Sequence, residues 1–484
     1  MAGVGFELKK LFKKKGSFFH LLKAYSVSAI VTEGPLLLNI ILLFALRLML
    51  NLFGASYAVQ ELYLVTTTYI MTFSLGSANT VLMFISRFIS DCIYEKRRKD
   101  ILPSFFTTIF WMLLILGPVF GIYIFSLDKP LLHKMLNLLQ FLVMLIVWIQ
   151  MAYLSAIKKY LLVLLGFIAA TLGSISFSLI FLFAGMEELT AVFTASLIGY
   201  LILLILYTKE MIQYFPMGEV NLFLLFPHLD KYKDLLLTGF LITVGMYGHT
   251  IVFWFSEYST KVMDYMAYCM KYDISNYFAS LTILPFMVTF VVSMEVDFYE
   301  AYRKYFDTIL NEGTYDDIKA ERRNLTKTLF RELAHVFEMQ FFIEIICITF
   351  LANLLSVLGF DLEMLVIYRY LCIGYCFYVL AKSVIIILMY FDSRIGALKV
   401  SAVFAVTSVA FSIATLFFGI ESYGLGFVAA LAVTALYGII TLKKYIEHLE
   451  FHVFCSQPLF ADNEIGVFER LGGYWNEKLK KKGK

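Results

Sequence analysis

The chain has 484 residues, of which 60% are hydrophobic and 17% aromatic, and its mean hydropathy is +0.79. Soluble domains do not tolerate such an apolar fraction, since roughly 20 apolar residues already span a bilayer core as a helix. The net charge of +3 gives no reason to expect nucleic-acid binding, because membrane topology and anionic lipid account for the basic residues. We therefore expect an all-α integral membrane protein.

The N-terminal segment, residues 1–23, mixes lysines with bulky apolar side chains. This pattern predicts a cytoplasmic amphipathic helix at the membrane surface. It does not predict a cleavable signal peptide, because the following apolar run is too long and no small-residue cleavage pattern follows it.

About twelve transmembrane helices follow. We expect them at residues 24–48, 61–85, 104–126, 135–157, 160–184, 190–207, 234–256, 276–294, 341–359, 365–390, 395–419 and 423–442. With the N-terminus inside, most of the 40 Lys and Arg fall on the cytoplasmic side, and the exceptions outside are Lys129, Lys134, Lys261 and Lys271. This bias predicts that both termini are cytoplasmic.

A polar stretch with two prolines, residues 209–233, divides the spans into two groups of six. We expect an N-terminal bundle at 24–208, a linker at 209–233 and a C-terminal bundle at 234–442. Because each half has an even number of spans, the two bundles should be parallel repeats. The strings Tyr94-Glu95-Lys96-Arg97-Arg98-Lys99 and Tyr299-Glu300-Ala301-Tyr302-Arg303-Lys304 offer a short internal echo of such a repeat.

Two further cytoplasmic segments are expected. The insertion at 295–340 carries charge pairs at helical spacing and should be largely helical. A basic tail occupies 443–484.

The chain lacks the motifs of several enzyme classes. It has no GxxxxGK[ST] motif for an ATP-driven pump and no DxD motif of a glycosyltransferase. Its six cysteines show no CxxC spacing, so we expect no disulfide framework, metal site or cofactor. Transport would have to draw on an ion gradient, on substrate binding or on a partner enzyme.

Ionisable residues at membrane depth are the candidates for a substrate path, because each one is costly to bury. In the first span Glu33 precedes Gly34-Pro35, where proline weakens the helix, but it could equally pair with Arg47 as structural glue. Arg47 could also extend to the outer surface. In the seventh span His249 follows two nearby glycines and could titrate, bind a sugar hydroxyl or simply pack.

The tenth span contains both Arg369 and Lys382. Lys382 is the better cavity candidate, although it could extend to the cytoplasmic headgroups. We expect Glu33 and Lys382 to face a central cavity.

Basic residues after the second and eighth spans lie at equivalent positions on the cytoplasmic side. Arg97 and Arg98 in the first loop, and Arg303 and Lys304 in the second, could bind a soluble enzyme through complementary charges.

Several sequence blocks, in order along nearly the whole chain, resemble the PelG family. Members of this family are the polytopic inner-membrane subunit of the Pel exopolysaccharide export system. They are related to the multidrug/oligosaccharidyl-lipid/polysaccharide flippases. The blocks are Met1-Ala2-Gly3-Val4-Gly5-Phe6-Glu7-Leu8-Lys9-Lys10-Leu11, Gly34-Pro35, Thr238-Gly239, Phe253-Trp254-Phe255-Ser256, Lys271-Tyr272-Asp273, Phe278-Ala279-Ser280-Leu281, Pro285, Glu295-x-Asp297-Phe298, Gln340, Tyr390-Phe391-Asp392 and Tyr423-Gly424-x-Gly426-Phe427. One departure is His249-Thr250, where the family tends to carry an Asp-Lys pair.

The resemblance implies a location in the bacterial inner membrane and two six-helix bundles that form a V-shaped cavity. It implies export of an acidic or amino-sugar-rich polymer of the N-acetylhexosamine type, made by a cytoplasmic glycosyltransferase. Other Pel membrane subunits, one of them responsive to cyclic di-GMP, would be partners. The chain itself would not be an enzyme.

Two other functions remain open from the sequence. One is a flippase for lipid-linked saccharides or an ion-coupled antiporter, with Glu33 and Lys382 as titrating groups. The other is a membrane scaffold that activates the glycosyltransferase without transporting anything.

Overall fold

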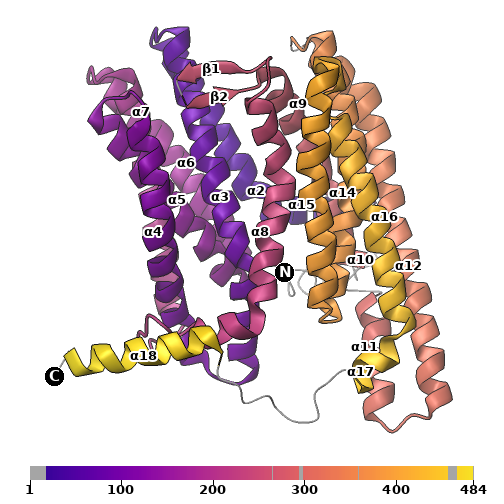
Figure 1. Ribbon diagram of the computed structural model, residues 1–484. Coiled ribbons are helices and arrows are strands. Elements are labelled where there is room, and N and C mark those ends of the chain that lie inside the picture. The colour runs from indigo at the N-terminus through magenta and orange to yellow at the C-terminus, as the bar shows by residue number, and fades with distance from the viewer. Residues whose placement is uncertain are drawn as a thin grey trace. The chain divides into compact units, whose positions relative to one another are not determined.

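The structure is a computed structural model that describes residues 18–157, 159–263, 265–293, 298–357, 359–455 and 466–482 (Figure 1). Within these residues, eleven helical segments are long and apolar enough to cross a membrane. They are formed by α2 (Phe18–Leu52), α3 (Tyr57–Tyr94), α4 (Ile101–Ser126), α5 (Leu131–Ala156), α6 (Tyr160–Phe183), α7 (Glu188–Tyr214), α8 (Phe226–Trp254), α12 (Tyr315–Ile346), α14 (Leu362–Tyr390), α15 (Arg394–Thr415) and α16 (Leu425–Glu447). The expected all-α membrane fold is confirmed.

Shorter elements connect or extend these helices. They are η1 (Arg98–Asp100), β1 (Thr260–Met263), β2 (Met266–Tyr268), α9 (Met270–Ser280), η2 (Leu281–Ile283), α10 (Leu284–Ser293), α11 (Tyr299–Leu310), η4 (Cys347–Leu351), α13 (Ala352–Val357), η5 (Leu416–Phe418), η6 (Ile420–Ser422), α17 (Leu449–Phe454) and α18 (Val467–Lys482). The strands β1 and β2 form one antiparallel hairpin, in which Thr260 is opposite Tyr268.

The expected eighth span, residues 276–294, is not one regular helix. It is divided into α9, the 3₁₀ turn η2 and α10. Pro285, the second residue of α10, has no backbone N–H to donate to the carbonyl of Leu281, so a continuous α-helical ladder cannot cross this point. The span therefore contains a built-in interruption at Leu281–Ile283.

The expected ninth span, residues 341–359, continues a helix that begins in the insertion. Helix α12 starts at Tyr315, where Thr314 and Asp317 form a capping box, and passes into the π-helical turn η4 and then α13. Over the described residues from 298 to 340, the insertion consists of α11 and α12 joined by a turn at 311–314.

The described chain divides into two compact units. The N-unit contains Glu33–Thr243, the hairpin Thr260–Tyr268 and α18. The C-unit contains Val244–Ser259 and the described residues 269–455, together with residues 18–32 of α2. The division falls within α8, beyond the expected linker at 209–233.

The core of the N-unit is formed by α3, α5, α6 and α7. Small residues let these helices approach closely: a Cβ on Gly199 of α7 would lie 2.7 Å from the Ala170 carbonyl oxygen of α6. The first part of α8 packs on α3 in the same way, since a Cβ on Gly239 would lie 2.6 Å from the Thr80 oxygen.

The last helix also packs on the N-unit. The Asp230 carboxylate accepts hydrogen bonds from the backbone N–H groups of Phe468 (3.3 Å) and Glu469 (2.8 Å) and so caps the start of α18. The Phe468 ring packs at 6.1 Å from Phe226. The tail therefore contains an anchored helix.

In the C-unit, α14 packs against α9, α15 and α16. It is mostly buried, as its residues Ile367, Leu371, Val379, Val384 and Leu388 illustrate. The second part of α8 packs on α15, where a Cβ on Gly245 would lie 2.4 Å from the Phe404 ring. The two glycines before His249 are therefore needed for close helix packing.

Candidate functional site

The interruption of the eighth span places polar groups inside the C-unit. Thr282, in η2, is 4% exposed and faces two residues of α12, Gln340 and Glu344. These two are one helical turn apart on the buried stripe of α12 that also includes Leu333 and Val336. The sequence thus puts a carboxylate and an amide on the face that packs inward.

We call Thr282, Gln340, Glu344 and Cys372 the Glu344 network. Glu344 Oε1 lies 2.7 Å from Thr282 Oγ1 and 2.6 Å from Gln340 Nε2, and Gln340 Nε2 also donates to the Thr282 carbonyl at 3.1 Å. The Cys372 thiol of α14 interacts with the same carboxyl group. Glu344 Oε2 and Gln340 Oε1 are buried and have no hydrogen-bond partner among the described residues.

The Glu344 network lies at about the middle of the membrane. The helical rise from Leu362, where α14 begins, to Cys372 is about 15 Å, half of a hydrocarbon core roughly 30 Å thick. Glu344 is 2% exposed, and none of the described residues forms an ion pair with it. A carboxylate buried at this depth costs several kcal/mol unless it is neutralised, which makes Glu344 a functional candidate.

A second network surrounds His249, which is fully buried. Its Nδ1 lies 2.6 Å from the Tyr272 hydroxyl of α9, and its ring packs 4.1 Å from Phe427 of α16. Thr250 follows it, and Asn276 joins Thr250 (3.4 Å) to the Tyr375 hydroxyl (2.7 Å). His249 Nε2 has no partner among the described residues, so the ring combines packing with an unused polar atom.

The other predicted path residues lie elsewhere. Lys382 is half-buried on α14, with its ammonium 5.6 Å from the centre of the Tyr378 ring. Arg369 is exposed on the same helix, and Arg47 is half-buried on α2. Helix α2 runs through Pro35, and the side chain of Glu33 lies outside the described part of the structure.

The structure places the predicted docking residues in two different local settings. Arg97 binds Glu95 (2.6 Å) and Asp100 (2.9 Å) in the turn after α3, next to the exposed Arg98. In that turn Lys96 has a positive φ of 60°. The two echoing strings are therefore not folded alike, because Tyr94 ends α3 whereas Tyr299 begins α11.

The second pair lies on α11. Arg303 forms an exposed pair with Asp307 at 3.4 Å, and Lys304 binds Glu321 of α12 at 2.7 Å. Lys304 therefore joins the two helices of the insertion, while Arg303 is the more available charge.

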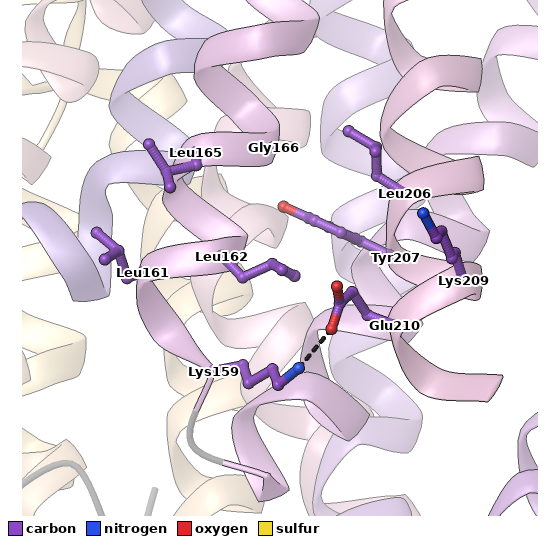
Figure 2. A pocket seen from close by; sticks show the side chains of 9 residues that line it. All are labelled: Lys159, Leu161, Leu162, Leu165, Gly166, Leu206, Tyr207, Lys209 and Glu210. Carbon is purple, nitrogen blue, oxygen red and sulfur yellow. Dashed lines mark hydrogen bonds and ion pairs between the residues drawn. The ribbon is translucent and has the colours of Figure 1, made fainter. Parts of the chain in front are cut away.

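A groove of about 550 Å³ lies between α6 and α7 of the N-unit (Figure 2). Its charged end is the ion pair between Lys159 and Glu210, and its wall includes Gly166, against which the Tyr207 ring packs. Leu161 and Leu165 line it and are exposed. Since this ion pair is already formed, the C-unit networks are the stronger candidates for chemistry.

The sequence matches the family described as "PelG: Putative exopolysaccharide Exporter (EPS-E)" over residues 1–454. The chain belongs to this family. The comparison with curated proteins gave no match.

Solved structures of transporters share the fold. A MOP superfamily transporter from Pyrococcus furiosus superposes with a TM-score of 0.61 at 11% identity, over 87% of this chain and 96% of that one. An inward-facing multidrug resistance MATE family transporter gives 0.61 at 12% identity, over 87% and 99%. The outward-facing MATE transporter gives 0.57 at 14%, over 87% and 96%. Family and fold make this PelG-family protein a multi-pass membrane transporter.

The sequence analysis overlooked Glu344. Its signal was present, because Glu344 is an acidic residue inside the expected span 341–359 and belongs with the other ionisable residues at membrane depth. Gln340 entered only as part of the family resemblance. The pairing of both with Thr282 depends on the interruption of the eighth span.

Proposed function

We propose that this protein exports a Pel-like exopolysaccharide, rich in N-acetylhexosamine, across the bacterial cytoplasmic membrane while a cytoplasmic glycosyltransferase makes it. The observation that carries the proposal is the match to an exopolysaccharide-exporter family over residues 1–454. Eleven candidate spans on a transporter fold are consistent with it.

The polymer path would use charges that are expensive at membrane depth. Arg369 supports this idea, because it is exposed on α14 about 10 Å beyond Leu362. An exposed guanidinium there needs lipid headgroups or water, and a hydrated path would supply water. We assign Glu33, Arg47, His249 and Lys382 to the same path, as contacts for the polymer or as counter-charges.

The glycosyltransferase would bind at the basic positions of the cytoplasmic side. Arg98 supports this, since its side chain is exposed. Arg303, exposed beside Asp307, is the second anchor. Other Pel membrane subunits, including one responsive to cyclic di-GMP, would complete the assembly.

The test is polymer translocation in vesicles. The full chain is reconstituted with its glycosyltransferase and the other membrane subunits, nucleotide sugar is added outside, and a glycosidase then digests the polymer that remains outside. Protected polymer should appear only in vesicles that contain this chain. Vesicles prepared without it serve as the control.

Two results would favour the alternatives. If polymer is made at the normal rate only with this chain, yet stays open to glycosidase, the protein is a scaffold that activates the enzyme. If no polymer is protected but lipid-linked saccharide or a small cation crosses, the protein is a flippase or an antiporter, as the fold shared with multidrug resistance MATE transporters would favour.

The orientation is tested separately. Reporter tags at the N-terminus, at Gly313 between α11 and α12 and at the C-terminus should all report the cytoplasm, while a tag near Lys261 should report the outside. An external Gly313 tag would refute the proposed topology.

A further inference from the structure

The hydroxyl group of Thr282 lies between two acceptors. Its Oγ1 is 2.6 Å from the backbone oxygen of Ala279 and 2.7 Å from Glu344 Oε1. A threonine hydroxyl carries a single proton. The hydroxyl therefore either shares its proton between these two oxygens or donates it to one of them.

The protonation state of Glu344 decides which oxygen receives the Thr282 proton. If Glu344 is protonated, its O–H donates to Thr282 Oγ1 and the threonine O–H donates to Ala279 O, so both contacts are hydrogen bonds. If Glu344 is ionised, the carboxylate attracts the threonine O–H, and the bond to Ala279 O is weakened. Protonation of Glu344 thus strengthens the bond from Thr282 to the Ala279 oxygen, and ionisation weakens it.

Among the described residues around Glu344 none carries a positive charge, and the groups that support its ionised form are the neutral donors Thr282, Gln340 and Cys372. Thiols and phenols face it: Cys347 on its own helical segment and Tyr368, Cys372, Tyr375 and Cys376 on α14. On the side of α9, η2 and α10, its described polar contact is Thr282. An uncompensated charge there costs several kcal/mol, which proton binding removes.

The donor Thr282 and its backbone acceptor Ala279 belong to neighbouring parts of the interrupted span. Ala279 is in the last turn of α9, and Thr282 is in η2. The π-helical turn η4 begins at Cys347, directly after the helical turn that holds Glu344. Irregular turns of this kind are frequent at functional sites. Gain or loss of one proton thus changes a hydrogen bond at a point where the backbone is already weakened.

We propose that Glu344 is a proton-binding site that couples transport to the proton gradient, with Thr282 as the positioning residue that passes its protonation state to the break between α9 and α10. The coupling part of this inference rests on the proposed transport function, whereas the proton site does not. The ligand is the proton, and the bound form is a neutral carboxylic acid.

The first experiment detects the proton directly. Infrared difference spectra of the full chain in lipid vesicles, recorded through a pH titration, should contain a carbonyl stretch of a protonated carboxylic acid. This band should be absent in Glu344→Gln. It should be shifted in Thr282→Val, because valine has the shape of threonine but no hydroxyl group, and it should be unchanged in Thr282→Ser. Glu332→Gln is the matched control, because Glu332 is a buried acid on the same helix that is paired with Arg331 at 3.0 Å.

The second experiment measures polymer export at several external pH values. Glu344→Gln, a neutral mimic of the protonated acid, should lower export by about fivefold to a hundredfold, the usual range for lost coupling between two ligands, and should abolish its pH dependence. Thr282→Val should reduce export, and Thr282→Ser should restore it. Glu332→Gln should behave as wild type.

The outcomes separate the two proposals. If the infrared band titrates and is lost in Glu344→Gln, but no polymer is translocated by any variant, the proton site stands and the export function fails. An unchanged band in Glu344→Gln, or export that depends on Na⁺ and not on pH, would overturn the proton site. Size-exclusion profiles show whether each variant is folded. If Glu344→Gln does not fold, Thr282→Val provides the test instead.

Discussion

The Lys271 ammonium lies 2.5 Å from the Glu363 carboxylate, joining the first turn of α9 to the first turn of α14. Asp361, the N-cap residue of α14, lies 2.8 Å from the same ammonium. One lysine therefore joins the first turns of two helices that pack together in the C-unit.

Removing this cation should weaken the C-unit slightly. We expect Lys271→Met to lower the free energy of unfolding by about 0.5–1 kcal/mol, because the partners are partly exposed and solvent screens them. A double-mutant cycle with Glu363→Gln, followed by thermal unfolding in detergent, isolates the pair. Lys443→Met, which removes a 4.0 Å exposed pair with Glu447, should leave stability unchanged. A zero coupling energy in the cycle would contradict the prediction.

A pH effect is expected from Lys129, in the loop between α4 and α5. The residue is 7% exposed, its ammonium donates to Thr66 Oγ1 at 2.8 Å, and burial lowers the pKa of Lys129 to about 8. Because the unfolded chain holds this proton more tightly, Lys129 costs stability below pH 8, and the cost disappears as pH rises toward the ordinary value.

The corresponding variant is Lys129→Met. It should raise the free energy of unfolding at pH 7 by about 1–3 kcal/mol, and the difference from wild type should shrink between pH 8 and 10. Lys134→Met, from the same region but with a partly exposed side chain, serves as the control. Equal pH profiles for Lys129→Met and wild type would show that Lys129 is not desolvated.

We expect that Gly426 cannot be replaced by a residue with a side chain without loss of stability. A Cβ there would lie 2.5 Å from the Phe411 carbonyl oxygen, so α15 and α16 would have to separate. We expect Gly426→Ala to destabilise the protein by about 1–3 kcal/mol. Gly121→Ala, where nothing lies within 4 Å, should be neutral or slightly stabilising. Similar melting temperatures for the two variants would refute this packing argument.

Variants of Lys382 test whether this residue lines the polymer path or only packs against its neighbours. We expect Lys382→Met to reduce polymer export at normal protein abundance, because the path loses a positive charge, and Lys382→Arg to keep most of it, since Arg retains the charge and the contact with Tyr378. Glu33→Gln should also reduce export. Full export by Lys382→Met and Glu33→Gln, measured with a lectin against secreted polymer, would remove both residues from the path.

Docking of the glycosyltransferase is tested by charge reversal at exposed positions. Arg98→Glu and Arg303→Glu should weaken co-purification of the enzyme, because a complementary surface becomes repulsive. Arg97→Glu and Lys304→Glu would also break ion pairs within the chain, since both side chains bind acidic partners there, so their effect on docking would be harder to interpret. Lys399→Glu, exposed on α15, is the control. Unchanged co-purification of Arg98→Glu and Arg303→Glu would place the docking site elsewhere.

The sequence predicts the spans well because length and apolarity alone determine which segments enter a membrane. It does not predict the break at Leu281–Ile283, although Pro285 marks it, because prolines also occur inside continuous helices such as α2, which runs through Pro35. The Glu344 network needs that break to bring Thr282 to α12, so the site depends on a tertiary contact that no local pattern encodes.

The pairing of Asp230 with the backbone of α18 has a consequence for biosynthesis. The transmembrane helices of the N-unit leave the ribosome first, but the hairpin Thr260–Tyr268 and α18, which complete this unit, follow later. The hydrogen bonds to the Asp230 carboxylate therefore cannot form until the final helix has been synthesised, since insertion proceeds from the N-terminus. A ribosome that stalls late in translation would leave the first half of the protein incomplete, and nascent chains would be most exposed to membrane quality control in that interval.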